Sequence, residues 1–256
     1  MLWNASAIKG YAIAASDGRI GTVSDFLFDD ASWLVRWLVV DTGTWLSGRK
    51  VLLPPSVLGH LDPEGEQFPV KLTMQQVKDS PEIDTDRSVS RQMETNVYDY
   101  YGWSPYWGTG FYMGGYGYMP GAAMASPHLG PSRREEEIGD AQRDHDDPHL
   151  RSVAAVTGYH IHASDGEIGH LEDSLLEDAD WCIRYLVVDT RNWWSGERVL
   201  ISPRSVREID WAERLIHLDI NRQKVKGGPS YDPAITIDGA FEEKFLMYYG
   251  IGWVAR

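Results

Sequence analysis

The chain of 256 residues contains a single cysteine, Cys182. One thiol excludes an intramolecular disulfide and any metal site built only from cysteines. No run of about 18 apolar residues occurs, so we expect no membrane-spanning helix. The first residues lack the basic start and apolar centre of a signal peptide. We therefore expect a soluble, cytoplasmic protein with no insertion into a membrane.

Positive charge is also scarce. Lysine and arginine number 24 against 38 aspartate and glutamate residues, which gives a formal net charge of −14. An acidic surface repels a phosphate backbone and no basic cluster offsets it, so we expect no nucleic-acid partner. The acidity suits solubility and basic protein partners. Aromatic residues are plentiful by contrast, with 11 Trp and 13 Tyr.

The sequence repeats itself at an offset of 148 residues. Residues 10–53 align with residues 158–201, and 25 of the 44 pairs are identical. A copy of about 100 residues has the size of a domain rather than of a short solenoid unit. We therefore expect two homologous domains, residues 1–103 and 152–256. Residues 104–151 join them, first rich in Gly, Tyr and Met and then charged, as in a solvated linker.

Each copy has the pattern of short strands joined by turns. The Asp-Gly pairs at 17–18 and 165–166 favour hairpin turns, and the apolar run 34–40 favours a buried strand. Helical patterns at 88–101 and 239–249 close the copies. Five or six strands in about 75 residues favour a small antiparallel barrel, because closure leaves no open strand edge. We expect a mainly β chain of two tandem barrels, each followed by a C-terminal helix.

Three motifs occur in the same order in both copies: Gly-Tyr-x-Ile-x-Ala-Ser-Asp-Gly-x-Ile-Gly, Trp-x-x-Arg-x-Leu-Val-Val-Asp-Thr and Trp-x-Ser-Gly-x-x-Val-Leu. The set resembles the PRC-barrel domain, and residues 90–103 resemble the stretch that follows this barrel in bacterial members of the family. The resemblance implies a six-stranded β-barrel. Members include the cytoplasmic barrel of the photosynthetic reaction centre H subunit and the C-terminal domain of a ribosome maturation factor. Those relatives bind protein complexes and are not catalysts.

The resemblance does not transfer either role outright. We expect no membrane anchor of the H subunit kind, and the chain has two barrels in place of the maturation factor's extra N-terminal domain. A context like that of the reaction centre or of ribosome assembly is thus implied by the resemblance alone.

Charged residues at repeated positions have structural explanations. Asp41 and Asp189 follow the most apolar strand of each copy, where an aspartate suits the cap of its own turn. Arg36 and Arg184 lie inside that strand and must reach solvent or a carboxylate, because an unpaired buried charge is costly. We expect ion pairs, with an anionic ligand as the alternative. The expected partners are Asp25 and Asp173, or Asp30 and Asp178.

Four histidines belong to neighbouring strands of the second copy. His160 and His162 share one strand face, and His170 and His217 lie on the strands beside it. Imidazoles bind transition metals, but the first copy has alanine at the positions of the first two. We therefore expect solvent-facing side chains, with no metal and no cofactor. His160 and His162 are the residues that a metal would use.

Aromatic residues crowd the region 98–118, well above ordinary density. Stacking on nucleic-acid bases would require interleaved lysine or arginine, which is missing. The region either covers a barrel face or the contact between the copies, or it forms a patch for a protein partner. The residues that we assign to partner binding are Trp45, Trp103, Tyr106, Trp107, Trp193 and Trp194.

No catalytic signature emerges. Motifs of serine hydrolases, nucleotide-binding loops and dinucleotide folds are missing, and Cys182 takes the place of Leu34 as a small apolar residue. We expect no enzyme, but a non-catalytic protein-binding or assembly module that acts on an unidentified protein complex. The alternative is a sensor of a small ligand or metal, as in a stress response. We also expect the two barrels to pair within the chain, with homo-oligomers as a further form.

Overall fold

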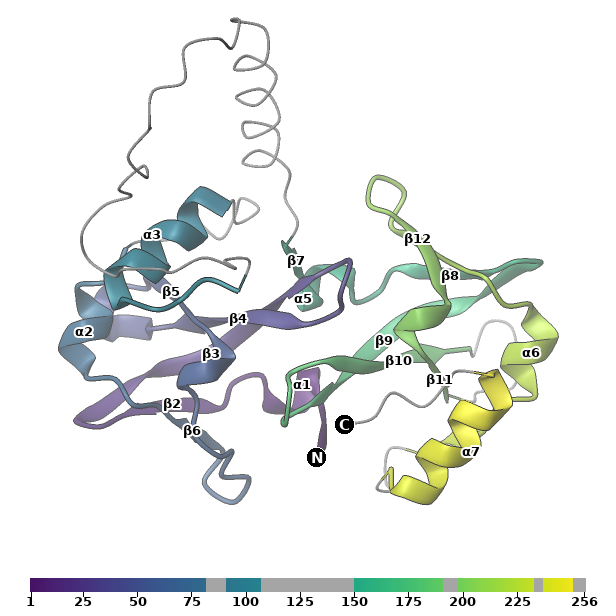
Figure 1. Ribbon diagram of the computed structural model, residues 1–256, viewed down its shortest axis with the longest axis horizontal. Helices are drawn as coiled ribbons and strands as arrows, with labels where there is room; N and C mark the ends of the chain where they lie inside the picture. Colours follow the sequence, from purple (N-terminus) through teal and green to yellow (C-terminus); the bar gives the residue numbers. More distant parts are fainter. Residues whose placement is uncertain (82–90, 107–149, 191–197, 233–236, 251–256) are drawn as a thin grey trace, which may run out of the picture. The chain divides into compact units, whose positions relative to one another are not determined.

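A computed structural model describes residues 1–81, 91–106, 150–190, 198–232 and 237–250. Most of its regular structure belongs to two β-sheets (Figure 1), which confirms the prediction of a mainly β chain. The strands are β1 (Leu2–Asn4), β2 (Ala12–Ala15), β3 (Gly18–Asp29), β4 (Val35–Asp41), β5 (Lys50–Leu53), β6 (Gln67–Pro69), β7 (Leu150–Ser152), β8 (His160–Ala163), β9 (Gly166–Glu177), β10 (Ile183–Asp189), β11 (Arg198–Ile201), β12 (Val206–Asp210), β13 (Leu215–Leu218) and β14 (Ser230–Tyr231).

Short helices connect and flank these strands. The α-helices are α1 (Ala5–Ile8), α2 (Met74–Lys78), α3 (Arg91–Tyr101), α5 (Val153–Val156), α6 (Arg222–Lys226) and α7 (Gly239–Tyr249), and the 3-10 helices are η1 (Gly43–Leu46), η2 (Pro55–Val57) and η3 (Pro203–Ser205). Among the described residues, no helix is both long enough and apolar enough to cross a membrane.

The chain forms two compact units that do not follow the sequence repeats. We call C-terminal unit the described residues of 1–10, 25–36 and 151–256, and N-terminal unit those of 11–24 and 37–150. The C-terminal unit therefore contains two segments of the first repeat together with the second repeat.

The sheet to which most strand residues of the N-terminal unit belong runs in the order β5-β4-β3-β2-β6, with β7 pairing β3. Trp37 lies in a run of buried residues of β4 and is completely buried, and the helix α3 brings the buried Glu94 to it. The Glu94 carboxylate accepts a hydrogen bond of 2.6 Å from the indole Nε1 of Trp37. A buried carboxylate needs such a donor, because an unpaired one would be costly to desolvate. The contact fixes where α3 packs.

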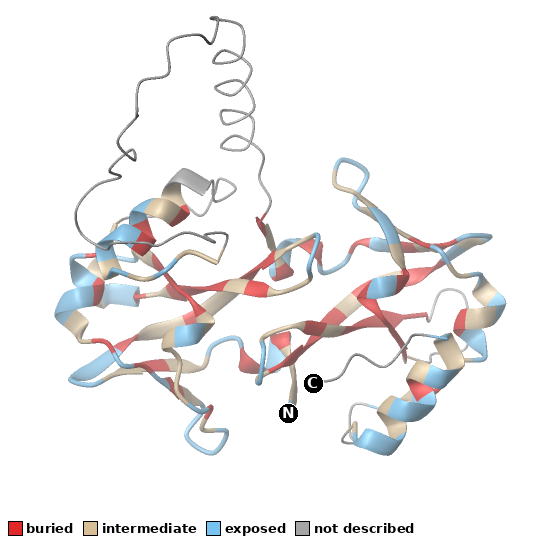
Figure 2. Ribbon diagram, in the orientation of Figure 1, coloured by how far each residue is buried: buried red, intermediate tan, exposed pale blue. Residues whose placement is uncertain are grey.

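The sheet of the C-terminal unit runs in the order β12-β13-β8-β9-β10-β11-β14, with β1 pairing β9. Figure 2 shows its buried positions concentrated along β9 and β10, which are buried at most of their positions. Phe245 of α7 is fully buried against Leu175, Tyr185 and Leu200 of this sheet. The apolar stripe predicted for residues 239–249 thus becomes the docking face of a helix with the same bounds.

One pairing in each sheet departs from the antiparallel prediction. β2 pairs β6 in parallel, and β8 pairs β13 in parallel. Period-two alternation gives the buried face of a strand but not its direction, so the sequence could not reveal this. Among the described strands, the first and last strands of each order do not pair with each other.

A glycine permits close backbone approach in both sheets. A Cβ atom at Gly21 would lie 2.1 Å from the carbonyl oxygen of Asp41, and one at Gly169 would lie 1.9 Å from that of Asp189. These separations are far below van der Waals contact, so only glycine fits. The Ile-Gly element of the repeated motif is therefore explained by packing of the long hairpin strand.

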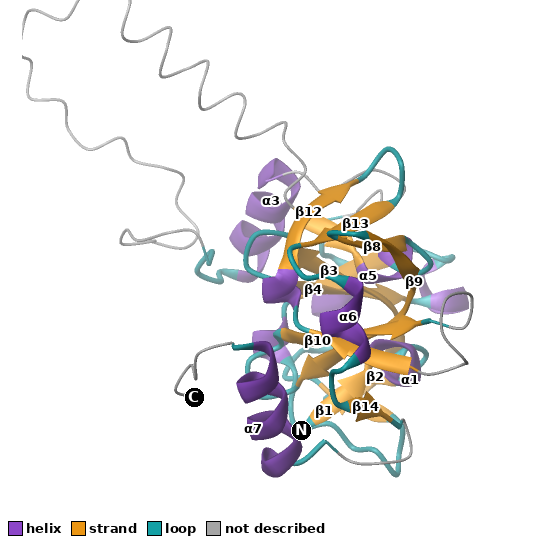
Figure 3. Cartoon of the chain, turned by 90° about the vertical axis from the view of Figure 1, so that its right-hand side faces the viewer, coloured by secondary structure: helices purple, strands orange, loops and turns teal. Residues whose placement is uncertain are grey.

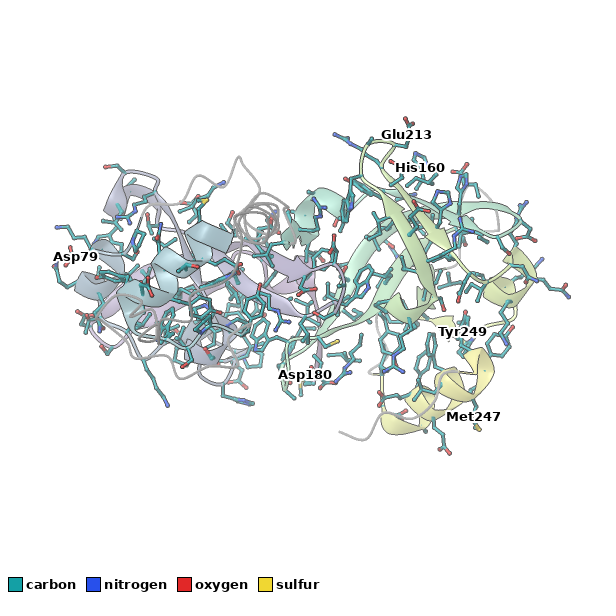
Figure 4. The ribbon with its side chains drawn as sticks, turned by 45° about the horizontal axis from the view of Figure 1, so that its top comes forward. Asp79, His160, Asp180, Glu213, Met247 and Tyr249 are labelled. Carbon is teal, nitrogen blue, oxygen red and sulfur yellow. The ribbon has the colours of Figure 1, made fainter. Side chains whose placement is uncertain are left out.

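The helix α7 is fixed at both ends and along one face. Asp238 caps its first turn by accepting from Phe241 N at 2.8 Å, and the hydroxyl of Tyr248 donates to the Lys224 carbonyl of α6 at 2.9 Å. The two helices are neighbours in Figure 3. In Figure 4, Tyr249 and Met247 lie on different sides of α7, and Met247 is 71% exposed.

Candidate functional site

The aspartates of the two hairpin turns cap helices. Asp17 Oδ1 accepts a hydrogen bond from Met74 N at 2.8 Å, and Asp165 Oδ1 accepts one from Arg222 N at 2.7 Å. The first amides of a helix have no partner inside it, so these carboxylates satisfy the starts of α2 and α6. The hairpin prediction is confirmed in both sheets by the strand pairing next to the turns.

The aspartates after the apolar strands have polar neighbours in both repeats. Asp41 Oδ1 accepts from Gly43 N at 2.7 Å, which confirms turn capping there. Asp189 is buried, and its Oδ2 lies 3.9 Å from Nε2 of His170. The second repeat thus uses this carboxylate next to an imidazole that the first repeat lacks.

The strand arginines form ion pairs, as expected, with carboxylates that the sequence analysis did not name. Arg36 forms an ion pair with Asp29 at 3.5 Å, and Arg184 pairs with Asp180 at 2.5 Å and with Glu177 at 3.8 Å. These carboxylates lie on the same hairpin as the arginine, so the pairs are local.

The predicted partners bind other segments of the chain instead. Asp173 is buried and accepts from Ser6 N at 3.2 Å. At the equivalent positions, Asp25 accepts from Ala154 N at 3.0 Å and from the hydroxyl of Ser152. Each repeat therefore offers an aspartate to the segment that precedes the first hairpin of the other repeat, and all these residues lie in the C-terminal unit.

The second pair of aspartates extends the same contact. Asp178 Oδ2 accepts from Trp3 Nε1 at 3.2 Å, and at the equivalent positions Asp30 pairs with Arg151 at 3.0 Å. The strand β1 also pairs with β9 in the same unit. The residues that sequence reasoning assigned to internal ion pairs thus hold the segments that the repeats exchange.

A strand joint connects the two repeats inside the C-terminal unit. Val35 N donates to the Trp181 carbonyl and Ile183 N donates to the Trp33 carbonyl, both at 2.9 Å. Between these bonds, Leu34 faces Cys182 in an antiparallel bridge. Leu34 and Cys182 are equivalent positions of the repeats, so the joint is self-complementary, as in a two-fold symmetric contact. Burial raises the pKa of the Cys182 thiol.

A groove of about 530 Å³ lies beside this joint. One wall is the turn at residues 30–33, which Asp29 holds by accepting from the amides of Ala31 and Ser32. The other wall is residues 203–211, from η3 along β12. A second cavity of about 180 Å³ shares Trp33 and Arg204 with the groove.

Arginine and tryptophan give the groove its chemistry. Arg204 and Arg207 are exposed, and neither guanidinium forms an ion pair or hydrogen bond with a described residue. Trp211 is half-buried, and the guanidinium of Arg151 lies 4.1 Å from its ring centroid. Such a cation–π contact stabilises the position of the indole. Because Arg151 also neutralises Asp30, the groove can attract an anion.

The first repeat lacks these groove residues. At the positions of Arg204, Arg207 and Trp211 it has Ser56, Gly59 and Pro63. Glycine and proline disfavour a strand interior, and the chain between η2 and β6 makes isolated bridges where the second repeat has the strand β12. The fold therefore does not require the arginines, the tryptophan or the long strand edge.

The aromatic residues predicted for partner binding fall into three places. Trp45 is half-buried in η1. Trp103 stacks on Tyr101 with ring centroids 4.1 Å apart, and the Tyr106 hydroxyl donates to Glu94 at 3.2 Å. Burial raises the pKa of Tyr101 to about 12. Trp107, Trp193 and Trp194 lie outside the described residues, as does most of the stretch to residue 118.

The histidines line neighbouring strands of the C-terminal unit, as predicted. His160 Nδ1 lies 3.1 Å from Glu167 Oε1, and the rings of His162 and His217 meet edge to face with centroids 6.0 Å apart. His160 and Glu213 are labelled in Figure 4. Among the described residues, no three histidine, cysteine, aspartate or glutamate side chains are arranged to hold a metal ion.

Sequence reasoning missed Arg204, Arg207 and Trp211. These residues occupy positions at which the repeats differ, whereas the sequence predictions rest on residues that the repeats share. A comparison of the two copies position by position identifies them, because aromatic and arginine residues at surface positions that the fold does not require are typical of interfaces.

Two comparisons with known proteins bear on the fold. Residues 4–72 match the PRC-barrel domain family. An uncharacterized protein of Deinococcus radiodurans is 37% identical over 82 residues, which cover 32% of this chain and 29% of that protein. The chain thus spans less than a third of that relative's length. The motifs of the first repeat, the sheet built on them and the family match agree: the chain contains a PRC-barrel domain.

Proposed function

We propose that this protein is a non-catalytic binding module that takes part in the assembly of a protein complex, and that the groove of the C-terminal unit is its binding surface. The observation that carries the proposal is the difference between the repeats. Arg204, Arg207 and Trp211 stand on a barrel-type fold that the first repeat builds without them. Arginine and tryptophan are the residue types enriched at binding hot spots.

The character of the groove supports a macromolecular ligand. It is an open groove along a strand and a turn, with Trp33 and Trp211 half-buried in its walls. Such indoles add apolar contact area when a partner covers them. The repeated aspartates support a non-catalytic role, because turn caps and segment joints account for their carboxylates.

Affinity capture with the full chain, followed by reconstitution from purified components, tests this function. We expect a protein partner that binds with defined stoichiometry in calorimetry. A chain that binds no macromolecule with defined stoichiometry would refute the proposal, as would turnover of a small molecule by the purified protein. Saturable binding of a small molecule without a protein partner would favour a sensor instead.

A further inference from the structure

We propose that the groove binds an extended acidic peptide segment, which adds as a strand to the free edge of β12 and places carboxylates on Arg204 and Arg207. The inference rests on the proposed protein-binding function and specifies the ligand of that surface.

The strand β12 offers an edge of useful length. It stands at the end of the sheet order, and β13 is its partner among the described strands. An edge strand presents a row of unpaired N–H and C=O groups that an extended peptide can extend by strand addition. The strand β14 at the opposite end has two residues, whereas β12 has five. Shortness protects β14 from pairing, and β12 lacks that protection.

The edge and the groove coincide. Val206, Arg207, Glu208 and Ile209 of β12 all line the groove. A peptide that pairs with this strand therefore lies in the groove, next to Trp33 and Trp211 of its walls. Alternate residues of an extended peptide point to opposite faces, so apolar residues can contact the indoles while acidic residues reach the arginines.

Charge selects the ligand. The chain carries a net charge of −14, yet the groove holds two arginines without ion pairs to described residues. Asp30 is neutralised by Arg151, which leaves Glu208 against Arg204 and Arg207. Charged side chains on an edge discourage indiscriminate pairing, and positive ones make the edge selective for an acidic segment. The arginine fork also suits carboxylates geometrically.

The first test measures binding of a defined probe to the full chain. The probe is a fluorescein-labelled octapeptide of alternating glutamate and valine, followed by fluorescence anisotropy. Arg204→Ser with Arg207→Gln is expected to weaken binding about tenfold, since each exposed charge pair contributes up to about fivefold. The matched control, Arg19→Gln with Lys71→Gln, removes the same charge at exposed positions outside the groove and should change affinity less than about twofold.

The second test separates strand addition from simple charge attraction. The same peptide with alternate backbone amides methylated cannot pair along one edge, and we expect it to lose most of its affinity. Hydrogen exchange should slow at β12 amides when the unmodified peptide binds, and should not change at β14. Circular dichroism and thermal melting verify that the variants keep the fold.

Four results would overturn this inference: equal binding by the groove variant, equal binding of the methylated peptide, no binding up to about 1 mM, or displacement of the peptide by millimolar inorganic phosphate or free glutamate. The last result would assign the arginines to a small anion. A purified protein partner that binds the wild type and the groove variant equally would remove this inference and leave the proposed function standing. Failure to find any protein partner would remove the proposed function itself.

Discussion

A cysteine in place of Leu34 is expected to form a disulfide with Cys182. The two residues face each other in an antiparallel bridge, and hydrogen bonds flank the pair on both sides. This pattern is that of a non-hydrogen-bonded pair, whose Cα atoms lie about 4.5 Å apart. Disulfides span Cα separations of about 4.4–6.8 Å, so the bond can form with little movement of the backbone.

The size of the effect follows from the loop that the bond closes. Residues 34 and 182 enclose a loop of roughly 150 residues, for which the chain-entropy relation gives about 5 kcal/mol at 25 °C. Engineered disulfides deliver less when they strain the fold, so about 5 kcal/mol is the upper limit of the gain. The gain should disappear when a reductant is added.

The native chain has a single thiol, so Leu34→Cys has two thiols and can form one intramolecular disulfide. After mild oxidation, Leu34→Cys should show no free thiol by titration, a linked peptide by mass spectrometry, and a higher urea midpoint than the reduced protein. Val35→Cys is the control, because adjacent strand residues point to opposite faces. Two free thiols in oxidised Leu34→Cys, or links formed only between molecules, would refute the strand joint.

Three further predictions concern the same unit. Gly169→Ala should lower the free energy of unfolding by about 3 kcal/mol in urea titration, because its Cβ would overlap the Asp189 carbonyl and force the strands apart. Asp173→Ala should lower the free energy of unfolding by about 1–3 kcal/mol, because it leaves the Ser6 amide without its acceptor. An unchanged urea midpoint would mean that Asp173 does not hold the exchanged segment. The raised pKa of Cys182 lowers its thiolate fraction near neutral pH. Iodoacetamide should therefore react more slowly with the folded chain than with the unfolded chain at pH 7. The ratio of the two rates should approach one as the pH rises above the thiol pKa values of the folded and unfolded chains.

Local patterns were predictable from the sequence. The hairpins follow from the Asp-Gly pairs, and the helix at 239–249 follows from its apolar stripe, because these features depend on residues a few positions apart. The aspartates at 25 and 30 were assigned wrong partners. Their actual partners lie 129 and 121 positions away along the chain, at a distance where charge pattern carries no information.

The groove was hidden for a different reason. Its two walls come from separate repeats, the turn at 30–33 and the stretch 203–211, and no sequence window contains both. The sequence does hold half of the signal, since Arg204 and Arg207 replace Ser56 and Gly59 of the other copy. Recognising the site also required the strand joint that brings Trp33 beside those arginines.

The exchanged segments also set the order of events during synthesis. Ser6 hydrogen-bonds a residue 167 positions later in the chain, so its partner does not exist when Ser6 is synthesised. At about 5–20 residues per second, the delay is on the order of 10 s. Such distant contacts form slowly, and the leading segment must stay in solution through this interval. A nascent chain of this protein therefore exposes the polar groups of Ser6 to solvent until the segment around Asp173 has been synthesised.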